Sequence, residues 1–234
     1  SSGSWKGIEV SGDARFEYSQ VLYGGTNIDV NGGTVTITDC SIGSATYGIR
    51  IANTRSATIT DTTFSGNIYS IVQDVNARAI LKGTITLLDK DYIYLLGTIL
   101  NQDNILGRDD GIPIRYYVPY GVTITIPETW TLTVLPKTEM LLHYSRLYVS
   151  GSVTADRATF TGLDKAPWSG IVVKGYGSFT ECNLSYGGLI FEGDGFVERC
   201  TILYGGYQNI PNIDISGGTV TITDCSIGSA TYGI

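Results

Sequence analysis

Two segments of the chain carry the same eighteen residues, GGTVTITDCSIGSATYGI, at Gly32–Ile49 and Gly217–Ile234. A looser match joins residues 5–12 (WKGIEVSG) to residues 168–175 (WSGIVVKG). The looser match and the exact match begin 27 residues apart in the first half of the chain (5 and 32) and 49 residues apart in the second half (168 and 217). The two spacings therefore differ by 22 residues. Repetition at a fixed period is typical of solenoid proteins, and 22 residues fits the length of one repeat.

A shorter pattern recurs near that period: an apolar residue, two residues, a small residue, one residue and an apolar residue. Its six copies are Phe16-Ser19-Val21, Ile37-Cys40-Ile42, Ile59-Thr62-Phe64, Phe179-Cys182-Leu184, Val197-Cys200-Ile202 and Ile222-Cys225-Ile227. Strands this short cannot bury an apolar face alone, but coils stacked about 4.8 Å apart place like residues above like and share one core. The sequence therefore predicts an all-β fold, a right-handed parallel β-helix (solenoid) of about 22-residue coils.

The repeat pattern divides the chain into three predicted parts. Residues 1–73 form a first block of β-helix coils, and residues 117–234 form a second block. Residues 74–116 lose the 22-residue pattern, which predicts an irregular connecting or capping segment. We expect the second block to stack on the first.

Several passages resemble a known family. Residues 121–140 (GVTITIPETWTLTVLPKTEM), 147–162 (LYVSGSVTADRATFTG) and 166–170 (APWSG) are similar to the opening of bacterial right-handed β-helix repeat proteins of the pectin-lyase-like superfamily. The stretches 36–51 and 57–67 resemble the short repeats of that superfamily. The resemblance implies the fold but no single function, because the superfamily holds lyases, hydrolases, phage tailspikes, adhesins and surface-layer proteins.

The composition excludes some partners. The net charge is −7 and no run of Lys or Arg occurs, whereas nucleic acids and anionic membrane surfaces require a basic footprint. No apolar stretch approaches the roughly 20 residues of a membrane span. The acidic, Tyr-rich and Thr-rich composition favours an extracellular or cell-surface location.

Two aspartates occupy the same position of adjacent coils. Asp39 and Asp61 each precede the small residue of the repeat, and a calcium ion bridging two such carboxylates is one interpretation. The other interpretation is a turn at which Asp tolerates unusual backbone angles. Superfamily lyases use clustered acidic residues for calcium, so the resemblance keeps the first interpretation open.

The polar stretch from residue 101 to 111 supplies two more candidate calcium ligands, Asp103 and Asp109. Its segment Gly107–Gly111 is similar to the Gly-Asp-Asp of polygalacturonase-like hydrolases, but Arg108 interrupts the motif and no His-Gly pair accompanies it. The segment is therefore predicted to be a solvated turn. No cofactor other than calcium is expected.

Cysteine and histidine provide little catalytic chemistry. The four cysteines, Cys40, Cys182, Cys200 and Cys225, all fall at the small position of the repeat. This predicts buried free thiols, because stacked coils give parallel Cβ vectors that suit a disulfide badly. The single histidine, His143, follows an apolar run and is predicted to be a side chain at a strand end.

Three tyrosines form the best candidate for ligand binding. Tyr23, Tyr186 and Tyr204 precede Gly-Gly turns at one register, so Tyr186 and Tyr204 are predicted to lie one above the other. Exposed tyrosine rings suit the faces of sugar rings. A tyrosine ladder that only stiffens the turn explains the same pattern.

These features favour a scaffold over an enzyme. A perfect duplication is typical of long surface proteins, and both ends of the chain stop within the repeat array, where strand edges would be unpaired. We therefore expect a longer native protein or end-to-end self-association. The first hypothesis is a surface-layer, fibre or adhesin module. The alternatives are a polysaccharide lyase or glycoside hydrolase, and a carbohydrate-binding module.

Overall fold

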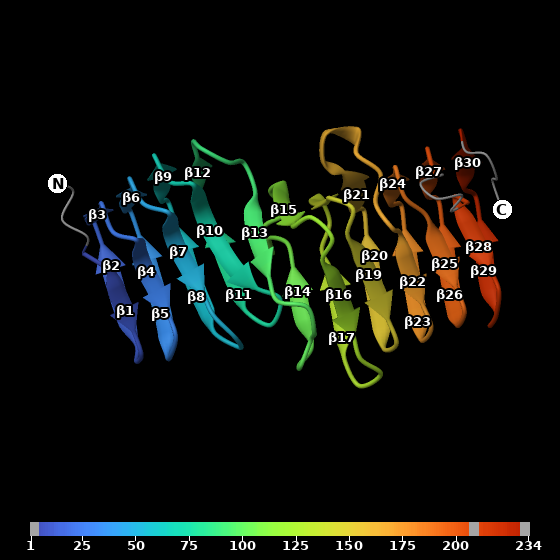
Figure 1. Cartoon of the computed structure of the whole chain (residues 1–234), viewed down its shortest axis with the longest axis horizontal. Coiled ribbons are helices and arrows are strands. Elements are labelled where there is room, and N and C mark those ends of the chain that lie inside the picture. The colour runs from blue at the N-terminus through green and yellow to red at the C-terminus, as the bar shows by residue number, and fades with distance from the viewer. Residues whose placement is uncertain (1–4, 206–210, 230–234) are drawn as a thin grey trace. The chain divides into compact units, whose positions relative to one another are not determined.

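The structure, a computed structural model, describes residues 5–205 and 211–229, and these residues form almost only short β-strands (Figure 1). The chain divides into two compact units, Ser1–Leu96 and Gly97–Ile234. In each unit the strands of one wall pair in parallel with those of the adjacent coils. The predicted all-β parallel solenoid is thus confirmed, with about 22 residues per coil.

Unit 1 has three walls of stacked strands. The first wall contains β1 (Ile8–Val10), β4 (Thr26–Val30), β7 (Tyr47–Ile51), β10 (Tyr69–Asp74) and β13 (Ile93–Leu96). The second contains β2 (Ala14–Glu17), β5 (Thr34–Thr38), β8 (Ser56–Thr60) and β11 (Arg78–Lys82). The third contains β3 (Gln20–Leu22), β6 (Ser41–Gly43), β9 (Thr63–Ser65) and β12 (Thr86–Leu87).

Unit 2 is built in the same way. One wall contains β15 (Ile114–Val118), β18 (Thr138–Leu142), β21 (Thr159–Gly162), β24 (Asn183–Ser185), β27 (Thr201–Leu203) and β30 (Ser226–Gly228). Another contains β14 (Asn104–Leu106), β17 (Thr131–Val134), β20 (Ser152–Asp156), β23 (Tyr176–Thr180), β26 (Asp194–Glu198) and β29 (Val220–Thr223). The last contains β16 (Thr123–Ile126), β19 (Arg146–Val149), β22 (Ile171–Val173), β25 (Leu189–Phe191) and β28 (Ile213–Ile215), and one short 3-10 helix, η1, spans Leu163–Lys165.

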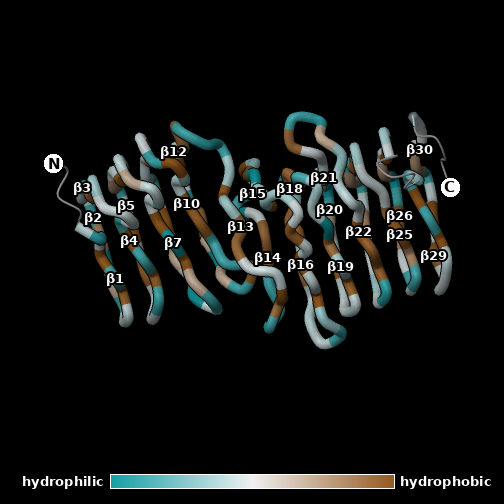
Figure 2. Tube along the Cα trace, viewed as in Figure 1, coloured by the Kyte–Doolittle hydropathy of each residue, from teal (hydrophilic) through white to brown (hydrophobic). Residues whose placement is uncertain are grey.

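Alternating side chains explain why these segments are strands. In β5 the sequence Thr-Val-Thr-Ile-Thr places Val35 and Ile37 in the core and the threonines toward solvent, as the two-residue period of a strand requires. Hydrophobic and polar residues accordingly alternate along the trace (Figure 2). Threonine suits the outward positions because its branched side chain is favoured on a pleated surface.

The core of unit 1 contains like residues in register. In unit 1, Ile28, Ile49 and Ile71 stack in successive coils and are all fully buried. In unit 2, Phe160, Phe179 and Phe191 come from three different walls instead, and their rings meet edge to face in the core, with centroids 6.2 and 6.5 Å apart. Each such side chain stabilises the fold by about 1.5–3 kcal/mol through burial.

A single left-handed residue turns the chain between two walls. The residue before the small position has a positive φ in every coil that carries the repeat; these residues are Tyr18, Asp39, Asp61, Glu181, Arg199 and Asp224. One residue in this conformation bends the chain sharply without a loop. The bend therefore keeps the two flanking strands only two residues apart.

The segment from residue 74 to 116 contains strands that take part in regular pairing. β11 pairs with β8, and β13 pairs with β10 through Val72 and Tyr94. β14 lies inside the polar stretch and pairs with β17. The predicted block boundaries, and the stacking of one block on the other, stay predictions.

Candidate functional site: the exposed coil end and its cysteine row

The small position of the repeat holds a side chain that contacts the backbone. In all six repeats its sulfur or oxygen lies 2.7 to 3.4 Å from the carbonyl oxygen two residues earlier. The six side chains are Ser19, Cys40, Thr62, Cys182, Cys200 and Cys225. The position therefore selects a small donor that satisfies a carbonyl at the left-handed bend. The signal was in the sequence, since every copy has Ser, Thr or Cys.

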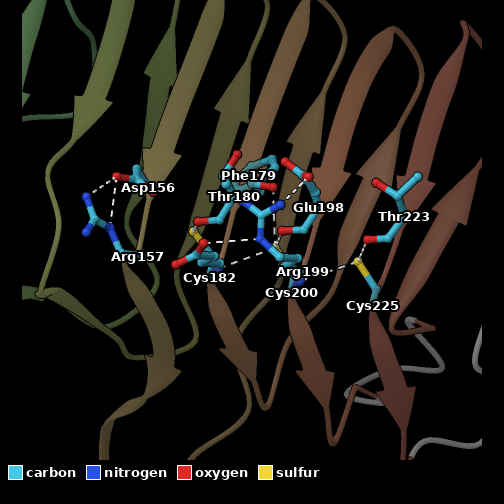
Figure 3. A network of polar contacts seen from close by, with 11 residues as sticks. Asp156, Arg157, Phe179, Thr180, Cys182, Glu198, Arg199, Cys200, Thr223 and Cys225 are labelled. Carbon is cyan, nitrogen blue, oxygen red and sulfur yellow. Dashed lines mark hydrogen bonds and ion pairs between the residues drawn. The ribbon is translucent and has the colours of Figure 1, made fainter.

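Three of these cysteines form a row on consecutive coils of unit 2 (Figure 3). The backbone N–H of Cys182 donates to the sulfur of Cys200, and that of Cys200 donates to the sulfur of Cys225, each at 3.4 Å. All the cysteines in the described residues are free thiols, as predicted. Cys40, Cys182 and Cys200 are buried, whereas Cys225 is half-buried.

The surroundings of the three thiols shift their pKa values in different directions. Interaction with the Cys182 thiol lowers the pKa of Cys200, while interaction with Cys200 and burial raise the pKa of Cys182. Burial raises the pKa of Cys225. Cys200 is only 1% exposed, so a reagent reaches the row first at Cys225.

Charged residues occupy the left-handed bends beside this row and the positions next to them. Arg157 pairs with Asp156 at 2.8 Å, and Arg199 bridges Glu181 at 3.1 Å and also contacts Glu198 (Figure 3). These ion pairs lie at the surface, where such pairs contribute little to stability. Both arginines are therefore paired with carboxylates of this chain.

The four predicted calcium ligands divide between the two units. Asp39 and Asp61 sit at left-handed bends in unit 1, and the Asp61 carboxylate accepts a hydrogen bond from the Thr84 N–H at 2.8 Å. In unit 2 the Asp103 carboxylate accepts one from the Thr131 N–H at 2.7 Å. In residues 5–205 and 211–229 no group of three or more His, Cys, Asp or Glu side chains is arranged to hold a metal ion. Calcium binding by Asp39, Asp61, Asp103 and Asp109 stays a prediction.

Within the segment Gly107–Gly111, Asp109 and Asp110 form an exposed turn, but Arg108 is not solvated as the sequence predicted. The Arg108 side chain is buried, 4% exposed, and its guanidinium donates to the Asp110 carboxylate at 2.9 and 2.5 Å. This hydrogen bond lowers the pKa of Asp110. Sequence reasoning missed the burial because the side chain enters the unit at a place that has no repeat pattern.

The predicted tyrosine stack is present. The rings of Tyr186 and Tyr204 lie 5.3 Å apart and only 13° from parallel. Tyr23 belongs to unit 1, where its ring is exposed. The role of the three tyrosines in ligand binding stays a prediction.

His143 lies in an aromatic cluster that sequence reasoning missed. It follows β18, and its Nδ1 lies 3.1 Å from the Tyr117 hydroxyl. The rings of Tyr120 and Tyr144 lie 5.2 and 5.5 Å from the imidazole. The cluster joins residues 26 positions apart, a contact that only the coil register reveals.

The coil end of unit 2 is the most exposed part of the repeat. β29 and β30 carry the same sequence as β5 and β6, yet Ile222 and Ile227 are half-buried whereas Ile37 and Ile42 are fully buried. β5 pairs with strands on both sides, β2 and β8. Within the described residues, β29 pairs only with β26. An apolar coil surface and one edge of the strands therefore face outward at this end.

Comparison with known proteins adds little. No protein-family model matches the chain, and no curated protein matches it. Among solved structures, HetL, a pentapeptide repeat protein involved in heterocyst differentiation regulation from the cyanobacterium Nostoc sp. strain PCC 7120, is 11% identical over 99% of this chain and 92% of HetL, with a TM-score of 0.24. Within the described residues no helix has the length and apolar character needed to cross a membrane. The fold of this chain, a parallel β-solenoid, rests on its own strand pairing.

Proposed function

We propose that this chain is a structural β-solenoid module of an extracellular or cell-surface protein, of the surface-layer, fibre or adhesin type. Its C-terminal coil binds the N-terminal coil of a second copy. The observation that supports this proposal is that segment 32–44 of unit 1 is covered by a further coil in register, and that segment 217–229 has the same sequence.

The N-terminal coil fits the surface that it would cover. In unit 1 the covering coil places a small residue and two large apolar residues over the repeated segment: Ala57, Ile59 and Phe64. The N-terminal coil has the same order at the same register: Ala14, Phe16 and Val21. The total volume of the three side chains is similar in the two coils, because Phe16 and Val21 stand where the covering coil has Ile59 and Phe64.

The backbone edges also match. The residue directly after the small position of the repeat begins a strand and donates its N–H to the preceding coil. Ser41 donates to the Ser19 carbonyl at 2.9 Å, and Thr63 donates to the Cys40 carbonyl at 3.0 Å. By this pattern the N–H of Gln20 and the carbonyl of Cys225 face the open sides of the two end coils. Each backbone bond between copies would contribute about 0.5–1.5 kcal/mol net.

A proline variant tests the proposal. Gln20→Pro removes the N–H that would bind the second copy, and the first residue of an edge strand tolerates proline. We expect the wild-type chain to grow in mass with concentration in size-exclusion chromatography with light scattering, and Gln20→Pro to stay monomeric with an unchanged melting temperature. Ser41→Pro is the matched control, because it removes an internal bond and should lower the melting temperature. A wild-type chain that stays monomeric at every concentration would refute the association.

The location is tested separately. Antibodies raised against the chain should label intact, unpermeabilised cells of the source organism. Labelling only after permeabilisation would exclude a surface module.

The alternatives have their own assays. A polysaccharide lyase or glycoside hydrolase should release unsaturated or reducing sugar from acidic or neutral polysaccharides. A carbohydrate-binding module should bind them without cleavage, and the stacked rings of Tyr186 and Tyr204 are the observation in its favour. Either result would replace the structural proposal.

A further inference from the structure

A groove of about 650 Å³ crosses three consecutive turns of unit 1. Its lining includes Trp5, Tyr23, Ser44, Thr46, Gly66 and Ile68. This volume falls within the roughly 300–1,000 Å³ typical of ligand sites. Three of the lining residues with large apolar side chains are exposed: Trp5 at 41%, Tyr23 at 70% and Ile68 at 57%. The groove therefore offers apolar area that the fold itself does not use.

The groove occupies a place that the equivalent turns of unit 2 fill with a ring. Leu22 pairs with Gly43 in unit 1, and Ser185 pairs with Leu203 in unit 2. The next residue on each coil is therefore Tyr23 beside Ser44 in unit 1, and Tyr186 beside Tyr204 in unit 2. Unit 1 has serine where unit 2 has the second tyrosine.

The backbone φ angles at these positions are nearly the same in both units. The φ angles are 66° for Tyr23 and 56° for Ser44, against 65° for Tyr186 and 58° for Tyr204. All four residues adopt the left-handed conformation. The serine thus removes a ring without moving the chain.

The edge of the groove is held in place. The indole N–H of Trp5 donates to the Leu22 carbonyl at 3.1 Å. Trp168 makes the corresponding bond to the Ser185 carbonyl at 2.8 Å, also 17 residues along the chain, and is fully buried. An anchored indole beside an exposed tyrosine pre-organises two aromatic walls, which lowers the entropy cost of binding.

We propose that this groove binds a tyrosine side chain of a partner polypeptide, with its ring on Tyr23 in the place that Tyr204 takes on Tyr186. The internal stack at 5.3 Å and 13° shows that this turn geometry accommodates a phenol ring. Tyr204 is 51% exposed in its stack, so the outer end of such a ring meets water and its hydroxyl stays solvated.

The probe is N-acetyl-L-tyrosinamide, titrated into the wild-type chain and followed by NMR. We expect saturable shifts of the Tyr23 ring signals and intermolecular contacts between the two rings. N-acetyl-L-leucinamide is the apolar control, and methyl β-glucopyranoside tests a sugar in the same groove. Equal binding of the leucine probe, or tighter binding of the sugar, would overturn the proposal.

Three variants locate the site. Tyr23→Asn removes the ring but keeps a residue that tolerates the left-handed conformation, and should weaken binding roughly 2- to 12-fold, the range of one aromatic pair. Ser44→Tyr should fill the groove with the chain's own ring and abolish binding. Tyr18→Asn changes an exposed, left-handed tyrosine at another bend of the same coil and should leave binding unchanged. Unchanged binding in both Tyr23→Asn and Ser44→Tyr would disprove the site.

Discussion

The two identical segments of this chain meet different surroundings. Residues 32–44 in unit 1 and 217–229 in unit 2 share every letter, and both lie on a preceding coil. In the described residues only the first copy also has a coil above it. Contacts toward the preceding coil are reproduced in both copies, whereas burial by a following coil is not. The comparison separates what a repeat brings with it from what its neighbour supplies.

The reproduced contacts extend to the turn that precedes each copy. The Asn27 carboxamide accepts a hydrogen bond from the Gly24 N–H at 2.8 Å and donates to the Gly43 carbonyl at 2.8 Å. Asn212 does the same with Gly205 and Gly228, again at 2.8 Å. The sequences between these residues differ in length, so the network is set by the coil and not by the loop.

The largest expected difference between the copies concerns the core. Ile37→Ala should lower the free energy of unfolding by about 2–5 kcal/mol, because it leaves a cavity at a fully buried site. Ile222→Ala should cost no more than about half as much, since its side chain is already partly in water. Urea denaturation at low protein concentration measures both. Equal losses would show that the C-terminal coil is covered in solution.

A second pair of variants should behave alike. Gly33 and Gly218 both have positive φ, and a Cβ atom would lie 2.2 Å from the Gly12 carbonyl carbon in one and 2.1 Å from the Gly193 carbonyl oxygen in the other. Both neighbours belong to the preceding coil. Gly33→Ala and Gly218→Ala should therefore each cost about 1–3 kcal/mol in thermal or urea unfolding. A harmless Gly218→Ala would mean that the last coil does not rest on the one before it.

The asparagine network should give a smaller and graded effect. Asn27→Ala leaves the Gly24 N–H without its side-chain acceptor and removes one of the two donors to the Gly43 carbonyl, which keeps the Tyr23 N–H, at a cost of about 1–3 kcal/mol. Asn212→Ala should fall at the lower end of that range, because the Gly228 carbonyl is only partly buried. Comparing melting temperatures of the two variants decides the order. A larger loss for Asn212→Ala would contradict the picture of an exposed coil end.

The smallest perturbation is chemical labelling, which leaves the sequence intact. Cys225 is half-buried while the equivalent Cys40 is buried. Iodoacetamide should therefore modify Cys225 well before Cys40, Cys182 or Cys200, as peptide mass spectrometry can show. Raising the protein concentration should protect Cys225 if copies associate there. A Cys225→Ser variant should remain unlabelled in the native state, and labelling of Cys40 at the same rate as Cys225 would remove the distinction between the copies.

Much of the fold was predictable because the repeat acts locally. The period, the inward apolar positions and the register of Tyr186 with Tyr204 all follow from aligning the coils. The site was less predictable. The donor role of the small position was visible as Ser, Thr or Cys, but the reason for it is the left-handed bend, which a single sequence does not display.

The regions outside the repeat pattern were the least predictable. Arg108 was expected in solvent and is buried against Asp110, and the rings around His143 come from two different coils. Such contacts depend on loop lengths and register across coils. Residue type alone does not fix them.

The sequence by itself determined that this chain stacks short strands in parallel coils, because only stacking buries the recurring apolar positions. It also determined which residues face inward, since side chains alternate along every strand. The tertiary structure alone decided how deeply each copy of the repeat is buried, because exposure depends on which coil lies above. It likewise decided that Ser44 opens a groove beside Tyr23, since a missing ring matters only where the register places one.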